Sequence, residues 1–178
     1  MSAPAPVAPL ALVEEACRKS GLLWVAVADG RAVPAWHAWA DGAAYVVHGG
    51  GEQPLPDIVP GTARAVVTVR SKDRGSRLVT WVAAVRDEEP GTPAYESAVH
   101  VLTAARLNAR DLDGQARRWR EESRVTRLEP TGELVEGPGS MSDDSLAAAP
   151  APTWATTRGP LPWVVGGARR LRRRRGRT

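Results

Sequence analysis

Short apolar runs separated by turn residues dominate the first half of the chain. A helical stripe opens it, beginning after Pro9 and ending before Gly21; its members are Leu10, Val13, Ala16 and Cys17. Proline is tolerated in the first turn of a helix and glycine is common just after its end, so this pattern predicts an opening helix. From residue 22 the spacing becomes extended, and residues 22–28, 32–39 and 43–48 are predicted to be strands.

Two Asp-Gly pairs, Asp29-Gly30 and Asp41-Gly42, separate these three runs. Asp and Gly tolerate the positive φ angles of tight hairpin turns, so the pairs predict consecutive hairpins and a three-stranded antiparallel meander.

The middle and the end of the chain add three strands and two helices. A loop at 49–60 holds three consecutive glycines and three prolines, and β-rich runs at 63–70 and 77–86 flank a polar turn at 71–75. Helical spacing begins at Pro93 and continues to about Asn108, and a shorter helix is predicted at 115–122. Residues 124–129 are predicted to be a sixth strand that ends at Pro130.

This order of elements predicts an α+β domain with a six-stranded antiparallel barrel and flanking helices. Barrel closure is favoured because it removes exposed strand edges. The barrel domain is expected over residues 10–136, after a flexible N-terminus at 1–9. Residues 137–178 are rich in Pro, Ala and Gly, and a segment of this composition is expected to be disordered.

Charge is distributed unevenly over the 178 residues. The formal net charge is +4, from 24 basic and 20 acidic residues, but residues 158–178 hold eight arginines and no acid. Residues 1–157 therefore carry 16 basic and 20 acidic side chains, and the basic character belongs to the tail. The tail is either a solubilising end or a weak polyanion-binding segment, nucleic acid included, through Arg169, Arg170, Arg172, Arg173, Arg174, Arg175 and Arg177.

The remaining composition argues against several classes of protein. A single cysteine, Cys17, excludes an internal disulfide, and three scattered histidines lack metal-ligand spacing, so no metal site is expected. No signal peptide or membrane-length apolar run is visible, which predicts a cytoplasmic protein. A motif for hydrolytic catalysis is also lacking, and whether the chain is an enzyme stays open.

Four segments carry a family resemblance: GLLWVAV at 21–27, YVVH at 45–48, AVVTVR at 65–70 and LVTWVAAV at 78–85. Over about residues 10–135 the chain resembles the FMN-binding split β-barrel superfamily, the pyridoxamine 5′-phosphate oxidase-like proteins with their deazaflavin-dependent relatives. The resemblance implies a homodimer that binds FMN or a deazaflavin at the subunit interface. It also implies that groups after the third strand and from the central hairpin hold the cofactor phosphate.

The loop after the third strand departs from the family pattern. Glycines and Glu52 stand where the family offers Ser, Thr, Lys or Arg to the phosphate. Gly50 and Gly51 could still allow close backbone approach in an anion-binding nest, whereas Glu52 would repel the phosphate. The charge is then expected from the central hairpin, where Arg70, Lys72, Arg74 and Arg77 are the candidates unless this is only a solvated turn.

An aromatic cluster in the second predicted strand is the candidate for contact with the cofactor ring. Strand alternation places His37 and Trp39 on one face and Trp36 on the other. Trp39 could stack on a ring beside the His37 imidazole. The alternative is that these aromatic residues belong to the core or to a dimer interface.

Two functions remain from the sequence. The first is a flavin- or deazaflavin-binding oxidoreductase in which the cofactor carries the hydride. The second is a cofactor-free, dimeric binding or interaction module.

Overall fold

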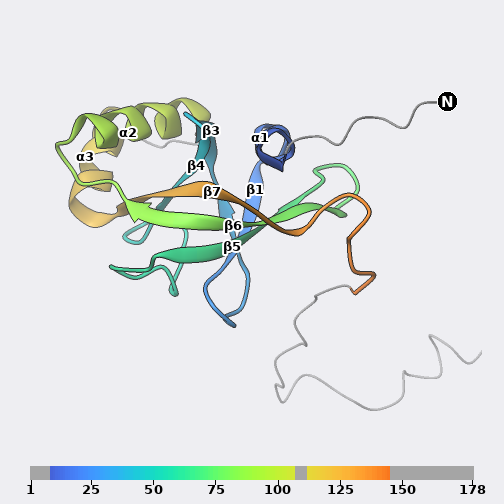
Figure 1. The fold of residues 1–178 in the computed structure, drawn as a ribbon. Helices are drawn as coiled ribbons and strands as arrows, with labels where there is room; N and C mark the ends of the chain where they lie inside the picture. The colour runs from blue at the N-terminus through green and yellow to red at the C-terminus, as the bar shows by residue number, and fades with distance from the viewer. Residues whose placement is uncertain (1–8, 107–111, 145–178) are drawn as a thin grey trace, which may run out of the picture. The chain divides into compact units, whose positions relative to one another are not determined.

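The computed structural model describes residues 9–106 and 112–144 (Figure 1). The predicted N-terminal segment before Pro9 and the arginine tail lie outside the described residues. The elements follow the order α1 (Pro9–Lys19), β1 (Leu22–Ala26), β2 (Val33–Trp36), β3 (Ala38–Ala40), β4 (Ala43–His48), β5 (Arg64–Arg70), β6 (Arg77–Asp87), α2 (Pro93–Ala105), α3 (Leu112–Glu122) and β7 (Arg124–Glu136).

The strands form one antiparallel sheet in the order β2-β1-β5-β6-β7-β4-β3, curled into a half-barrel. The α+β class is confirmed, but the prediction of six strands is wrong because the run at 32–39 breaks at His37. Its first part, β2, pairs with β1 at one edge of the sheet, and its second part, β3, pairs with β4 at the other edge. Since only His37 separates Trp36 from Ala38, the two edges must approach each other there.

His37 is also the point where the sheet is tied to α1. Its side chain is buried, and its Nε2 lies 3.0 Å from the carbonyl oxygen of Cys17 in α1. Because a carbonyl only accepts, Nε2 carries the proton and donates. Burial lowers the pKa of His37 to about 4, so the imidazole is neutral at pH 7.

Two hydrophobic clusters use opposite faces of β4. The first lies inside the curl and joins Val46 of β4 to Val67 of β5, Trp81 of β6 and Cys17 of α1. The second contains Tyr45 and Val47 of β4 together with residues of α2 and α3, including Leu102 and Trp119. Every residue of β4 is therefore buried, and α2 and α3 lie together beside β3 and β4 while α1 lies apart from them (Figure 1).

Several predicted element ends differ from the structure: the strand expected at 22–28 ends at Ala26, and the helix expected at 115–122 begins at Leu112. The last strand does not stop at Pro130 but continues to Glu136, because a register shift between β6 and β7 accommodates a residue without an N–H. Helix α2 starts as predicted, with Thr92 as its cap, but ends at Ala105 rather than near Asn108. In the described part of the chain, no helix has the length and apolar character needed to cross a membrane.

The buried His37 predicts a specific acid sensitivity. Its pKa is lowered from 6.5 to about 4 on folding, so the unfolded chain binds the proton more readily. The neutral His37 ring therefore makes its full contribution to the free energy of unfolding above pH 6.5. This contribution is lost as the pH falls toward 4, by up to about 3 kcal/mol. Urea unfolding at pH 7 and pH 4.5 should show a smaller loss for His37→Gln than for the wild type. Equal losses in the two proteins would mean that His37 is not the responsible group.

Candidate functional site

A groove of about 690 Å³, here called the basic groove, lies between the end of α1 and the turn that joins β5 to β6. Arg18 and Lys19 line it from α1, and Arg70 and Lys72 line it from the hairpin. Trp24 of β1 also lines it. Two of the predicted phosphate ligands, Arg70 and Lys72, are thus brought to one cavity.

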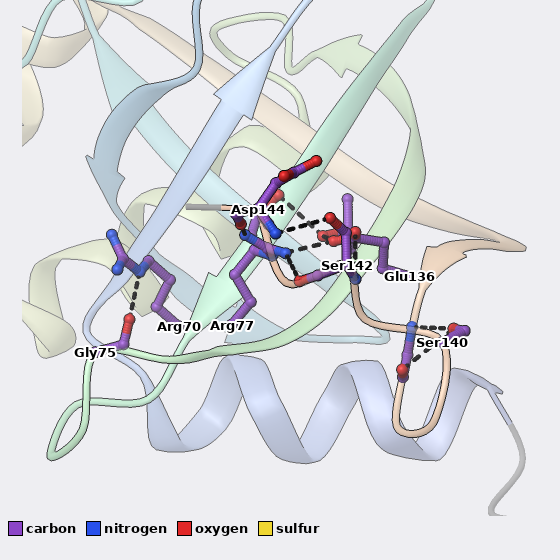
Figure 2. Close-up of polar contacts among 10 residues, drawn as sticks. Arg70, Gly75, Arg77, Glu136, Ser140, Ser142 and Asp144 are labelled. Carbon is purple, nitrogen blue, oxygen red and sulfur yellow. Dashed lines mark hydrogen bonds and ion pairs between the residues drawn. The ribbon is translucent and has the colours of Figure 1, made fainter. Parts of the chain in front are cut away.

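Arg70 is held in a defined position within this groove. Its Nε donates to the Gly75 carbonyl oxygen at 2.6 Å, which Figure 2 shows as the Arg70–Gly75 contact. Its guanidinium carbon lies 5.2 Å from the centroid of the Trp24 ring, a cation–π distance. A cation fixed by a ring and a carbonyl loses little freedom when an anion binds.

Arg77 does not join this set, although it faces Arg70 in the β5–β6 register. Its Nε pairs with Glu136 at 3.1 Å, and its Nη atoms donate to the carbonyl oxygens of Ser142 and Asp144 at 2.6 Å each (Figure 2). The Arg77 side chain is only 12% exposed. It therefore anchors the residues after β7, while Arg74 is exposed in the turn and does not line the basic groove.

A second groove, of about 590 Å³, lies on the other side of the α1 end and is here called the alanine groove. His37, which joins β2 to β3, and Trp39 of β3 both line it, and so does His100 of α2. Its other lining residues are mostly small: Ala38, Ala40, Ala104 and Ala105. Trp36 faces elsewhere, with its ring centroid 6.3 Å from that of Trp119.

The hydrogen-bonding side chains that line the alanine groove are Arg18, Ser20 and His100, and the part around His37 and Trp39 offers mainly ring and methyl surface. The His37 Nδ1 and Trp39 Nε1 atoms are buried and have no hydrogen-bond partner among the described residues. Because these atoms are shielded from solvent, a ring in this groove would contact the residues by packing.

The two grooves adjoin each other, because Arg18 and Ser20 line both. Ser20 is positioned by its hydroxyl, which donates to the Leu22 carbonyl oxygen at 2.8 Å and lies 3.2 Å from that of Arg70. A single elongated molecule could therefore place a planar end in the alanine groove and an anionic end in the basic groove.

The glycine loop at residues 49–51 contacts other parts of the protein and lines neither groove. Gly50 has a φ of +57°, and a Cβ at this position would lie 2.7 Å from the Glu122 carbonyl oxygen at the end of α3. Gly50 thus permits close approach of two parts of the chain. Gly51 lines a separate polar pocket of about 390 Å³ and does not line either groove.

Glu52 is the centre of a polar cluster next to Gly51. Its carboxylate pairs with Arg106 and accepts from Trp119 Nε1 at 2.8 Å. The Arg106 guanidinium lies 5.2 Å from the Trp36 ring centroid and 5.9 Å from that of Trp119. The position where the resemblance implies a phosphate site is therefore filled by an internal ion pair between a loop and the end of α2.

The groove residues that the sequence interpretation missed include Arg18, Lys19, Ser20 and Trp24. Trp24 lies on the outer face of β1, because its neighbours Leu23 and Val25 point inward. Strand alternation was the signal that could have found it. Arg18 and Lys19 end a helix far from the hairpin in sequence, so no local pattern connects them with Arg70.

Comparisons with known proteins bear on the fold. No protein-family profile and no curated protein matches the chain. The structure is similar to that of HutZ, the heme storage protein from Vibrio cholerae, with a TM-score of 0.51 and 14% identity over 68% of this chain and 89% of that one. An FAD and heme binding protein from Mycobacterium smegmatis gives a TM-score of 0.44 and 18% identity, covering 87% of this chain and 92% of that one. At this identity the HutZ likeness supports a split-barrel type of fold and nothing finer.

The Glu52 cluster predicts a large effect of a small substitution. In Glu52→Gln, Arg106 would remain as a mostly buried cation without a carboxylate, because its side chain is only 25% exposed. We expect the free energy of unfolding to fall by about 2 kcal/mol, measured by urea unfolding. The control is Glu15→Gln, which removes an exposed pair with Lys19 and should leave the free energy of unfolding nearly unchanged. Similar losses in both variants would contradict a central role for Glu52.

Proposed function

We propose that the protein binds a phosphate-bearing flavin or deazaflavin across the two grooves, as a member of the FMN-binding split β-barrel superfamily. The observation that carries the proposal is that Arg18 and Ser20 line both grooves, which joins the surface at His37 and Trp39 to the cations at Arg70 and Lys72. The donor set suits the group, since guanidinium and ammonium groups bind phosphate and flat apolar walls accept a ring.

In this proposal the protein is an oxidoreductase. A bound flavin or deazaflavin would supply hydride transfer. The chain itself orients the cofactor: Arg70 and Lys72 bind the phosphate, and Trp39 with the neutral His37 ring limits the position of the planar end. Gly50, Gly51 and Arg77, which the sequence also suggested for cofactor binding, have no part in it because they lie outside both grooves.

A heme-type cofactor is the second candidate, since the split-barrel protein HutZ is named for heme storage. Among the three histidines, His37 bonds to Cys17 and His48 to Thr126, and both are buried. His100 is exposed, lines the alanine groove and is the residue that could reach a heme iron there.

Titration of the purified protein separates these cofactors. With FMN or a deazaflavin we expect a change in visible absorbance and a raised Tm, and Arg70→Ala and Lys72→Ala should each weaken binding about tenfold by removing a charged contact. Arg64→Ala is the matched control, because Arg64 lies at the other end of β5 and pairs with Glu133. Unchanged spectra and Tm with FMN and the deazaflavin would overturn the proposal, and a Soret band with heme alone would favour the second candidate.

A homodimer is part of the same proposal. The outer face of the sheet carries Trp24 and Ala26 of β1 opposite Thr68 and Val66 of β5, and all four side chains are only partly buried. A second copy packed on this face would cover Trp24 and bring the basic groove next to the interface. This is the arrangement that the family resemblance implies.

Mass measurement in solution tests the dimer. The wild type should show twice its chain mass of 19.0 kDa in light scattering. Val66→Glu should give monomers, since a charge in an apolar interface has no partner there. A wild type that stays monomeric at all concentrations would contradict this part of the proposal.

The alternative function is a cofactor-free interaction module. It is favoured by the loop at residues 49–53, where Gly50 packs against α3 and Glu52 pairs with Arg106. A protein that forms dimers but gives no response to any of the three cofactors would support this alternative.

A further inference from the structure

Cations face the basic groove from two separate elements. Arg18 and Lys19 lie in the last turn of α1, whereas Arg70 and Lys72 belong to the end of β5 and the turn after it. No aspartate or glutamate of the described segments lines either groove. Residues 1–157 carry more acids than bases, so four cations around one cavity are a local concentration of positive charge.

The basic groove, about 690 Å³ in volume, extends from the hairpin residues Arg70 and Lys72 to the last turn of α1. A single phosphate on Arg70 and Lys72 would leave the α1 side of the groove filled with solvent.

The α1 cations are available to a ligand. Arg18 pairs with Glu14 at 2.9 Å and Lys19 with Glu15 at 2.6 Å, but all four side chains are about half exposed or more. Exposed pairs one helical turn apart contribute little to stability, so a ligand anion could replace either glutamate.

The end of α1 also does not strongly repel an anion. The carbonyl ends of a helix are its negative pole, which disfavours anions. Here the Ala16 carbonyl accepts from the Ser20 N–H at 3.1 Å and the Cys17 carbonyl accepts from His37. Two of the terminal carbonyls are therefore already bonded.

We infer that the ligand of this site carries two anionic groups, one bound by Arg70 and Lys72 and the other by Arg18 and Lys19. The inference rests on the proposed function and specifies its ligand class: a cofactor with a diphosphate, rather than one with a single phosphate. Arg18 lines both grooves, so the second anionic group would lie between the first phosphate and the planar end.

Inorganic anions test the second anion position without the ring. At constant ionic strength, pyrophosphate should raise the Tm of the wild type more than orthophosphate does. Arg18→Ala/Lys19→Ala should abolish this difference, and Glu14→Gln/Glu15→Gln should increase it by freeing the same two cations. Arg64→Ala should keep it. Equal effects of the two anions on the wild type, or an unchanged preference in Arg18→Ala/Lys19→Ala, would overturn the inference.

Flavins with no, one and two phosphate groups then separate this inference from the proposed function. Riboflavin, FMN and FAD share a ring, and binding should strengthen along this series. We expect Arg18→Ala/Lys19→Ala to reduce FAD affinity about tenfold or more and FMN affinity much less. If FMN and FAD bind equally, the two-anion inference fails while the proposed function stands. If no flavin binds, the proposed function itself fails, and the inference with it.

Discussion

The chain passes from one edge of the sheet to the other in a single residue, and the remaining architecture depends on that passage. His37 separates β2 from β3, so the sheet must curl until these two edges approach each other at His37. The imidazole is buried at this junction and donates to the Cys17 carbonyl. This bond fixes the end of α1 relative to the sheet, and the end of α1 is the wall that both grooves share. Closure of the fold and position of the candidate site are therefore set by the same contact.

Local patterns were sufficient to predict most elements. The Asp-Gly pairs marked hairpin turns, and the change from helical to alternating spacing located α1 and β1. The break at His37 could not be predicted, because the run at 32–39 is continuously extended and only pairing with two different strands divides it. The end predicted at Pro130 was wrong for a related reason. The free-energy cost of a proline within a strand depends on whether the partner strand shifts register there.

Part of the candidate site could be predicted from the sequence. His37 and Trp39 share one groove and Arg70 and Lys72 share another, as their short spacing in the sequence suggested. The roles of Glu52 and Arg77 did not follow, because their partners lie 54 residues away at Arg106 and 59 residues away at Glu136. The presence of an arginine in the sequence does not show whether its side chain is available to a ligand or is already paired with an acid. Only the tertiary structure made that distinction.

The two strands at the ends of the sheet are short, four residues in β2 and three in β3, and β2 contains Pro34. Short edges and a residue without an N–H give an approaching strand few hydrogen bonds to form. Growth of the sheet by addition of a strand from another molecule is thereby disfavoured, which protects the protein from aggregation through its edges. Any ordered association of two copies is then directed to side chains on a sheet face, where recognition depends on shape and charge rather than on the backbone.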